Sequence, residues 1–214
     1  MKNIIKKLLL VAFLATGSLF VRAQSKGTNT LGLGLNFQTQ KAEQTSQGIQ
    51  YVNEQETKGM SLGYGHFTKD NVKVGIEFFY GTNAYRSFGG DELNTKDYGG
   101  NLNYQRYYPI FKKFYAFGGG RVAYNYSKGG NTSSSQNTGL VSNVYSVGVN
   151  GGLSWFFSKR LALESDLLTA NIGFTRSRQT GTDVNGAYKN TSTGFNLNTT
   201  GAVNGLGFKI YFLF

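Results

Sequence analysis

Residues 31–38 read Leu31-Gly32-Leu33-Gly34-Leu35-Asn36-Phe37-Gln38. Leucine or phenylalanine occupies every odd position, and glycine, asparagine or glutamine occupies every even position. Successive side chains of a β-strand point to opposite faces, so this period of two predicts a strand with one apolar and one polar face. The same alternation recurs along the chain, and helical periodicity is nearly absent.

Seven further segments repeat the pattern, at residues 60–65, 72–81, 98–108, 114–126, 145–157, 161–167 and 206–214. The alternation slips at residues 168–171, which indicates a β-bulge. Eight strands that follow one another in antiparallel order can close on themselves without leaving an exposed edge. The sequence therefore predicts an all-β protein, an eight-stranded antiparallel up-and-down β-barrel.

The segments between the predicted strands alternate in length. The short ones are 68–71, 109–113 and 158–160, and the long polar ones are 40–57, 84–96, 128–141 and 176–193. Short turns at one rim and long loops at the other are typical of outer-membrane barrels. We therefore expect a transmembrane barrel, whereas a soluble sandwich has no reason to sort its loops in this way.

Aromatic residues favour an apolar face that points outward to lipid. One group lies beside the short turns, and a second group lies toward the long segments. Rings with a polar tip collect at the two membrane–water interfaces, so two belts are expected of a barrel in a bilayer. The alternative is a secreted soluble barrel whose apolar face encloses an apolar ligand. The first group is Phe67, Tyr107, Tyr108, Phe114, Tyr115, Trp155, Phe156, Phe157, Phe212 and Phe214, and the second is Tyr80, Tyr85, Tyr98, Tyr124, Tyr126 and Tyr145.

The polar face carries isolated charges of both signs. Opposite charges that converge inside a narrow barrel can satisfy one another, whereas an unpaired one is costly. We therefore predict an ion-pair network in the lumen, and the alternative for Lys73 is an unpaired charge at the solvent-exposed rim. Eight strands leave an interior only wide enough for side chains, which favours a plugged lumen over a narrow porin-like channel. The predicted network comprises Glu77, Arg121, Glu164, Asp166 and Lys209.

The N-terminal segment has the three parts of a secretory signal. Lys2, Lys6 and Lys7 precede an apolar run at residues 8–15, and Val21-Arg22-Ala23 provides small or tolerated residues before a cleavage site. The apolar run is shorter than the roughly 20 residues that a spanning helix needs. We predict that residues 1–23 are a cleaved signal peptide, with cleavage between Ala23 and Gln24, and that residues 24–214 form the outer-membrane β-barrel domain.

The last strand has the sequence Leu206-Gly207-Phe208-Lys209-Ile210-Tyr211-Phe212-Leu213-Phe214. With this terminal strand and its overall layout, the chain resembles the small OmpA/OmpX-like outer-membrane β-barrel proteins of Gram-negative bacteria. The resemblance implies a location in the cell outer membrane with both termini in the periplasm, and a structural or surface-interaction role. It also implies that Phe208, Ile210, Phe212 and Phe214 form the signal that the barrel-assembly machinery recognises.

Composition argues against catalysis and against bound cofactors or metals. The 214 residues include no Cys, which excludes disulfides and cysteine-based zinc sites, and a single His, which leaves no histidine cluster. His66 has no evident Ser or acid neighbour and is expected to lie at a membrane interface. Gly118-Gly119-Gly120 lacks the helix and the Gly-Lys-Ser/Thr sequence of a phosphate-binding loop. We expect no enzyme, no cofactor and no metal.

The formal net charge of +11 bears on the expected partners. The basic residues are scattered, so nucleic acid is not expected. Those in or beside the long segments would be placed to meet lipopolysaccharide phosphates. We expect a monomer in contact with outer-membrane lipid, lipopolysaccharide and the assembly machinery, and a surface adhesin remains an alternative. The basic residues in question are Arg86, Lys128, Arg176, Arg178 and Lys189, and the acids of the same segments are Glu54, Glu56, Asp91, Glu92 and Asp183.

Overall fold

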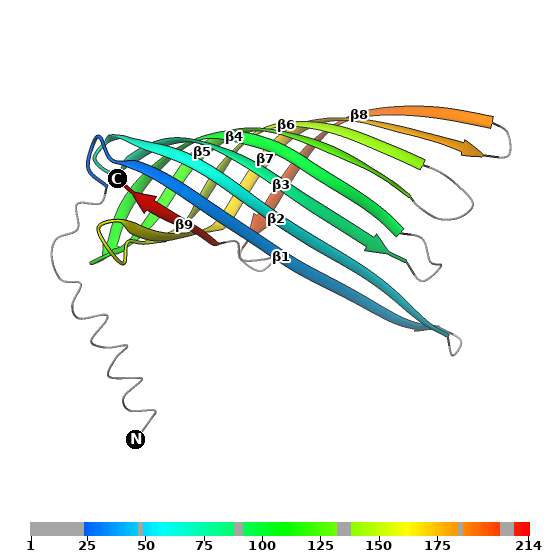
Figure 1. Ribbon diagram of the computed structural model, residues 1–214, viewed down its shortest axis with the longest axis horizontal. Coiled ribbons are helices and arrows are strands. Elements are labelled where there is room, and N and C mark those ends of the chain that lie inside the picture. The colour runs from blue at the N-terminus through cyan, green and yellow to red at the C-terminus, as the bar shows by residue number, and fades with distance from the viewer. Residues whose placement is uncertain (1–23, 47–48, 88–91, 132–137, 184–185, 202–207) are drawn as a thin grey trace, which may run out of the picture.

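The computed structural model describes residues 24–46, 49–87, 92–131, 138–183, 186–201 and 208–214 (Figure 1). The predicted signal peptide at residues 1–23 lies outside the described residues. No helix in the described part of the chain is long and apolar enough to cross a membrane. The strands are β1 (Asn29–Ser46), β2 (Ile49–Lys69), β3 (Val72–Arg86), β4 (Glu92–Phe111), β5 (Phe114–Asn131), β6 (Thr138–Trp155), β7 (Leu161–Asp183), β8 (Gly186–Gly201) and β9 (Phe208–Leu213).

The strands form one antiparallel ring. Strands β1 to β7 pair in sequence order, and β9 pairs with both β7 and β1, which closes the ring. Strand β8 continues alongside β7 on the far side of β9, so β8 and β9 are two parts of one eighth strand. The predicted all-β, eight-stranded antiparallel up-and-down barrel is therefore confirmed. We call the end where β9 completes the ring the closed end, and the opposite end the hairpin end.

The eighth strand differs from the prediction of one strand at residues 206–214. On β7, Leu168 pairs with Gly201 of β8 and Ser165 pairs with Phe208 of β9, so these two partners are three residues apart along β7. Gly201 and Phe208 are seven residues apart in the chain, so β9 does not continue the register of β8. Strand β8 was missed because its outward positions include only two large apolar residues, Phe195 and Leu197, which is too few for an alternating pattern.

The prediction of four long loops is wrong. Most residues of these polar segments continue the strands as paired hairpins, with the register extending to pairs such as Ser46 with Ile49 and Asp183 with Gly186. Backbone hydrogen bonds hold a ladder together without apolar side chains, so the apolar alternation marks only part of each strand. The hairpin tips at 47–48, 88–91, 132–137 and 184–185 lie outside the described residues.

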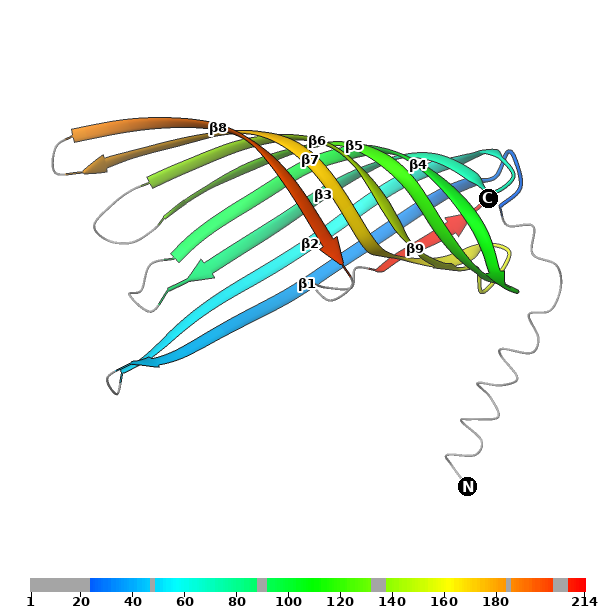
Figure 2. The same ribbon diagram turned by 180° about the vertical axis from the view of Figure 1, so that it is seen from behind.

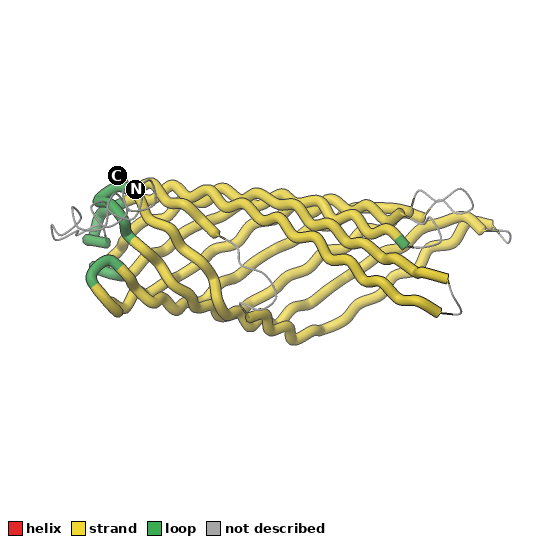
Figure 3. The backbone as a smooth tube through the Cα atoms, turned by 90° about the horizontal axis from the view of Figure 1, so that it is seen from below, coloured by secondary structure: helices red, strands yellow, loops and turns green. Residues whose placement is uncertain are grey.

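The three short turns lie where they are predicted, together at the closed end (Figure 3). Asn71 has a φ of 62° in the β2–β3 turn, a left-handed conformation that asparagine tolerates better than most residues. The predicted bulge in β7 is also present, slightly earlier than expected. Gly151 pairs with Leu168, whereas the next residue, Gly152, pairs with Asp166.

The apolar face of the sheet points outward. Leu31, Leu33 and Leu35 of β1 are about half exposed, and the corresponding apolar residues of the other strands are exposed in the same way. The side chains of the opposite face converge inside the ring, where most of the buried residues lie. The alternative of a barrel with an apolar interior for a ligand is therefore wrong.

Candidate functional site

Aromatic side chains fill the interior at the closed end. Phe67, Tyr107, Phe117 and Phe156 are each at most 3% exposed and form one buried cluster with Ala162 and Leu213. The ring of Tyr107 lies at the centre, with its centroid 5.7 Å from that of Phe67, 5.9 Å from that of Phe117 and 6.0 Å from that of Phe156.

This cluster corrects the predicted aromatic belt beside the short turns. Phe67, Tyr107 and Phe156 face the interior, whereas the neighbouring Tyr108 and Phe114 remain on the outside. Where two aromatic residues follow each other, as in Tyr107-Tyr108, they point to opposite faces of the strand, so only one of them can belong to a belt. At the other end of the apolar face, Tyr80, Tyr98, Tyr124 and Tyr145 are exposed on the outer surface.

A buried ion pair lies directly against the aromatic cluster. Nζ of Lys73 on β3 is 3.4 Å from Oε2 of Glu164 on β7, and both side chains are at most 4% exposed. Glu164 also accepts hydrogen bonds from Nε2 of Gln105 (3.0 Å) and from the hydroxyl of Tyr107 (2.8 Å). The ammonium group of Lys73 lies 4.1 Å from the centroid of the Tyr211 ring, a cation–π contact. The interpretation of Lys73 as a charge on the solvent-exposed rim is wrong.

A second charged layer lies next along the barrel. Nζ of Lys209 on β9 donates to Oε2 of Glu77 on β3 at 2.8 Å and lies 3.8 Å from Oδ2 of Asp166 on β7. Two asparagine amides complete the layer, because Asn101 donates to Glu77 (3.3 Å) and Asn150 donates to Asp166 (2.8 Å). Charged groups from β3, β7 and β9 thus meet inside the barrel, although these strands do not follow one another directly in the chain.

Arg121 lies apart from these pairs. Its Nε donates to Oδ1 of Asn171 at 3.0 Å. Within the described residues, no ion pair joins Arg121 to an acid, and Glu164 binds Lys73 instead. The structure therefore brings together Glu77, Asp166 and Lys209 of the predicted network, places Glu164 in a separate pair, and leaves Arg121 hydrogen-bonded to the uncharged amide of Asn171.

The wall of the barrel has a seam between β1 and β8. Residues 30–35 of β1 pair with β9, but no pairing joins residues 36–46 to β8 in the described part of the chain. The β1–β2 and β7–β8 hairpins lie apart at the hairpin end (Figures 1 and 2). Phe37 on one side of the seam is 70% exposed, and Phe195 and Leu197 on the other are 82% and 73% exposed. Alternation in the sequence carries no signal for this opening.

Basic side chains form a patch on the outer face of the hairpins. Lys96 of β4 and Lys128 of β5 are paired directly across the two strands, and both are exposed. On β7, Arg176 and Arg178 are exposed on the same outer face, and Val141 of β6 lies between Lys128 and Arg178 in the register. We call Lys96, Lys128, Arg176 and Arg178 the basic patch. Of the other predicted basic residues, Lys189 is exposed on β8 and Arg86 is exposed on β3.

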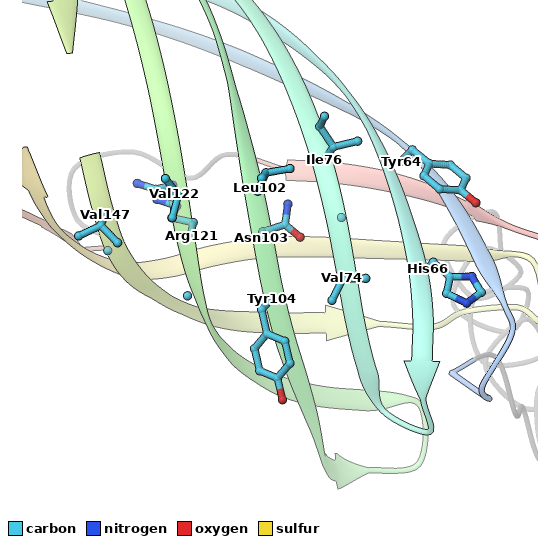
Figure 4. Close-up of a pocket in the computed structure, with 13 residues that line it drawn as sticks. Tyr64, His66, Val74, Ile76, Leu102, Asn103, Tyr104, Arg121, Val122 and Val147 are labelled. Carbon is cyan, nitrogen blue, oxygen red and sulfur yellow. The ribbon is translucent and has the colours of Figure 1, made fainter. Parts of the chain in front are cut away.

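A shallow pocket on the outer face contains the only histidine (Figure 4). Nδ1 of His66 lies 2.8 Å from Oδ1 of Asn29, which also accepts a hydrogen bond from the Tyr64 hydroxyl at 2.8 Å. The lining also includes five aliphatic residues, and these give the pocket a surface that suits a hydrocarbon chain: Val74, Ile76, Leu102, Val122 and Val147. Within the described residues, no three His, Cys, Asp or Glu side chains are grouped as a metal site would require. Gly118-Gly119-Gly120 lies inside β5.

The residues of the predicted assembly signal share the outer face of β9 and the chain end. Phe208, Ile210, Phe212 and Phe214 are 43–61% exposed. The backbone of Phe214 exchanges two hydrogen bonds with Asn29, at 2.8 Å and 3.0 Å. Of the two predicted cleavage-site residues, Ala23 lies outside the described residues and Gln24 is buried at the closed end.

Comparison with known proteins supports the fold. No protein-family model and no curated protein sequence matches the chain. Among solved structures, a major outer membrane protein from Thermus thermophilus matches with a TM-score of 0.49 and 11% identity, over 88% of this chain and 99% of that one. The outer membrane protein OprG from Pseudomonas aeruginosa is also similar, with a TM-score of 0.52 and 10% identity over 91% of this chain and 99% of OprG. The likeness to OprG, together with the closed order of the strands, shows that this chain is an all-β protein with the fold of an outer-membrane β-barrel.

Proposed function

We propose that this protein is a non-catalytic, monomeric β-barrel of the Gram-negative outer membrane with both termini in the periplasm. Its role in this proposal is structural, and the hairpins present a polar surface outside the cell. The observation that carries the proposal is the distribution of side chains between the two faces of the ring. Leucine, valine, isoleucine and aromatic residues are exposed outside, whereas the ion pairs of Lys73 and Lys209 lie inside.

This distribution suits lipid and disfavours water. A soluble protein of this size would bury such an apolar surface, and a large contiguous apolar patch on a monomer marks an interaction surface. In a barrel that spans a bilayer, lipid covers the outer face and polar residues fill the lumen. The aromatic cluster and the two ion-pair layers support a closed lumen, because side chains occupy the interior from Phe67 to Lys209.

Fractionation and heat modifiability test the proposal. We expect the protein in the detergent-extracted outer-membrane fraction, where unboiled protein migrates differently from boiled protein because the closed ring stays folded. Purified protein added to planar lipid bilayers should produce no steady conductance. Recovery in the soluble periplasmic fraction without a heat-dependent shift would contradict the membrane location, and stable single-channel currents would contradict the closed lumen.

We further propose that the basic patch binds the phosphate groups of lipopolysaccharide. Like charges directly across two strands destabilise a sheet, and Lys96 lies opposite Lys128 in this way. An anion that contacts both ammonium groups removes that repulsion. The patch lies beyond the exposed tyrosines Tyr98 and Tyr145 on the hairpin side, at the level where headgroup phosphates meet a barrel with an aromatic belt.

Thermal unfolding in detergent tests this binding. We expect added lipopolysaccharide to raise the melting temperature of the unmodified protein, and Lys96→Gln with Lys128→Gln to remove most of that rise. Lys41→Gln with Lys112→Gln is the matched control, because it removes two exposed lysines that lie outside the patch. An equal rise in the patch variant and the control would contradict a specific site.

A further inference from the structure

Gln24 is anchored in the closed end by the backbone around it. The residue is only 5% exposed, and its carbonyl oxygen accepts a hydrogen bond from the backbone N–H of Asn71 at 2.9 Å. Two residues later, the backbone N–H of Lys26 donates to Oδ1 of Asp70 at 2.8 Å, and that of Gly27 donates to the carbonyl of Phe67 at 2.8 Å. The chain from Gln24 onward is thus fixed against the β2–β3 turn.

The side-chain amide of Gln24 is buried without a hydrogen-bond partner. Neither Nε2 nor Oε1 has a partner within the described residues, although both atoms are inaccessible to solvent. Burial of an unpaired amide costs free energy, and burial of an unpaired charge costs more. Cleavage after Ala23 would create a positively charged α-ammonium group on this same residue. A reaction that removes this charge and reduces the number of unpaired N–H donors would therefore be favoured at this position.

We propose that Gln24 becomes an N-terminal pyroglutamate after the signal peptide is removed. This inference rests on the predicted cleavage between Ala23 and Gln24. The freed α-amino nitrogen attacks Cδ of the side-chain amide, so an N–Cδ bond forms and the Cδ–Nε2 bond breaks. Nε2 takes up the proton that the amine gives up and leaves as ammonia. The product is a five-membered lactam, and the reaction needs no oxidant, reductant or second substrate.

The lactam fits the buried position better than the encoded residue does. It carries no charge, and a single N–H replaces the ammonium group and the two N–H donors of the amide. The backbone carbonyl is unchanged by the reaction, so its hydrogen bond with Asn71 is retained. The modification would also protect the chain from aminopeptidases, which require a free α-amine.

Mass spectrometry of the N-terminal peptide tests the proposal on protein extracted from the outer membrane of cells that express the full chain. We expect a peptide that begins at residue 24 and is lighter than its unmodified sequence by one ammonia. A peptide with a free Gln24 would overturn cyclisation while leaving the cleavage site correct. A peptide that begins elsewhere would overturn both. The heat-dependent shift of the same sample reports membrane insertion separately.

Two controls keep the result specific. A synthetic peptide with the sequence that starts at Gln24, carried through the same digestion, shows how much lactam forms during preparation, and the extracted protein should contain several times more. In Gln24→Asn, the shorter side chain would have to close a strained four-membered ring, so its N-terminal peptide should keep its full mass. Equal lactam content in the protein and the synthetic peptide would overturn the proposal.

Discussion

Nζ of Lys73 lies 3.4 Å from Oε2 of Glu164, and the two residues belong to strands on opposite sides of the ring. Between β3 and β7, three strands intervene in either direction around the barrel. The pair therefore spans the lumen rather than linking neighbouring strands. Together with Lys209 and Glu77, it ties the strands that close the ring to the middle of the sheet.

Replacement of Lys73 by Met should destabilise the barrel strongly. The variant leaves the Glu164 carboxylate buried without a countercharge, and removal of one partner of a buried pair costs about 3–5 kcal/mol. Urea-induced unfolding in detergent, followed by the fluorescence of the single Trp155, measures the free energy of unfolding. We expect Lys73→Met with Glu164→Leu to recover most of the loss.

Arg121 provides a control for this comparison of single and double variants. Because Arg121 binds Asn171 and not Glu164, the losses of Arg121→Leu and Glu164→Leu should add in the double variant. Recovery in that double variant would mean that Arg121 and Glu164 interact and would contradict the pairing of Glu164 with Lys73.

Replacement of Phe67 by Ala should lower the free energy of unfolding more than most other aromatic substitutions. Phe67 is fully buried against Tyr107, and truncation of a buried phenylalanine costs about 3–5 kcal/mol. The same urea measurement with Tyr108→Ala is the control, since Tyr108 is half exposed on the outer face. Equal losses from the two variants would place both side chains in the same environment and contradict the buried cluster.

The sequence predicts the ring well because the period of two is local. Leu31 to Phe37 reveal both faces of β1 without any knowledge of the neighbouring strands. The partner of each charge depends instead on strand register and tilt, which no local pattern encodes. Lys73 illustrates this limit. It follows the β2–β3 turn closely, so its position in the sequence leaves the rim open as an alternative, yet in the structure its ammonium group is buried beside the ring of Tyr107.

The sequence fails to predict the hairpins and the seam for a different reason. The polar residues at the far ends of the strands alternate without a hydrophobic difference, so their sequence suggests loops although their backbones are paired. The opening beside β8 depends on the register change between Gly201 and Phe208, and a mismatch between two parts of one strand leaves no trace in composition.

Hydrogen exchange should reveal the seam in the folded protein in detergent. Within β1, backbone amides of residues 30–35 that face β9 are paired, whereas seam-facing amides of residues 39–42 have no pairing with β8 in the described part of the chain. We expect the second set to exchange much faster than the first. Residues 93–106 of β4 are paired on both sides and are the control for slow exchange. Uniform protection along β1 would mean that β1 and β8 pair in solution.

Variants of Phe214 can distinguish an effect on folding from an effect on assembly, because the backbone and the side chain of this residue have different environments. Its backbone exchanges two hydrogen bonds with Asn29, whereas its side chain is 61% exposed on the outer face. In Phe214→Ala the hydrogen bonds remain, so the free energy of unfolding of the barrel refolded in detergent should fall by at most about 1 kcal/mol, since little of the phenyl side chain is buried.

Assembly in living cells is expected to respond differently. If the assembly machinery recognises the phenyl side chain, the same variant should reach the outer membrane in much smaller amounts. Deletion of Phe214 removes the hydrogen bonds as well and should lower both the stability in detergent and the yield in cells. An unchanged yield of Phe214→Ala in the outer membrane would contradict the assembly-signal interpretation without affecting the fold.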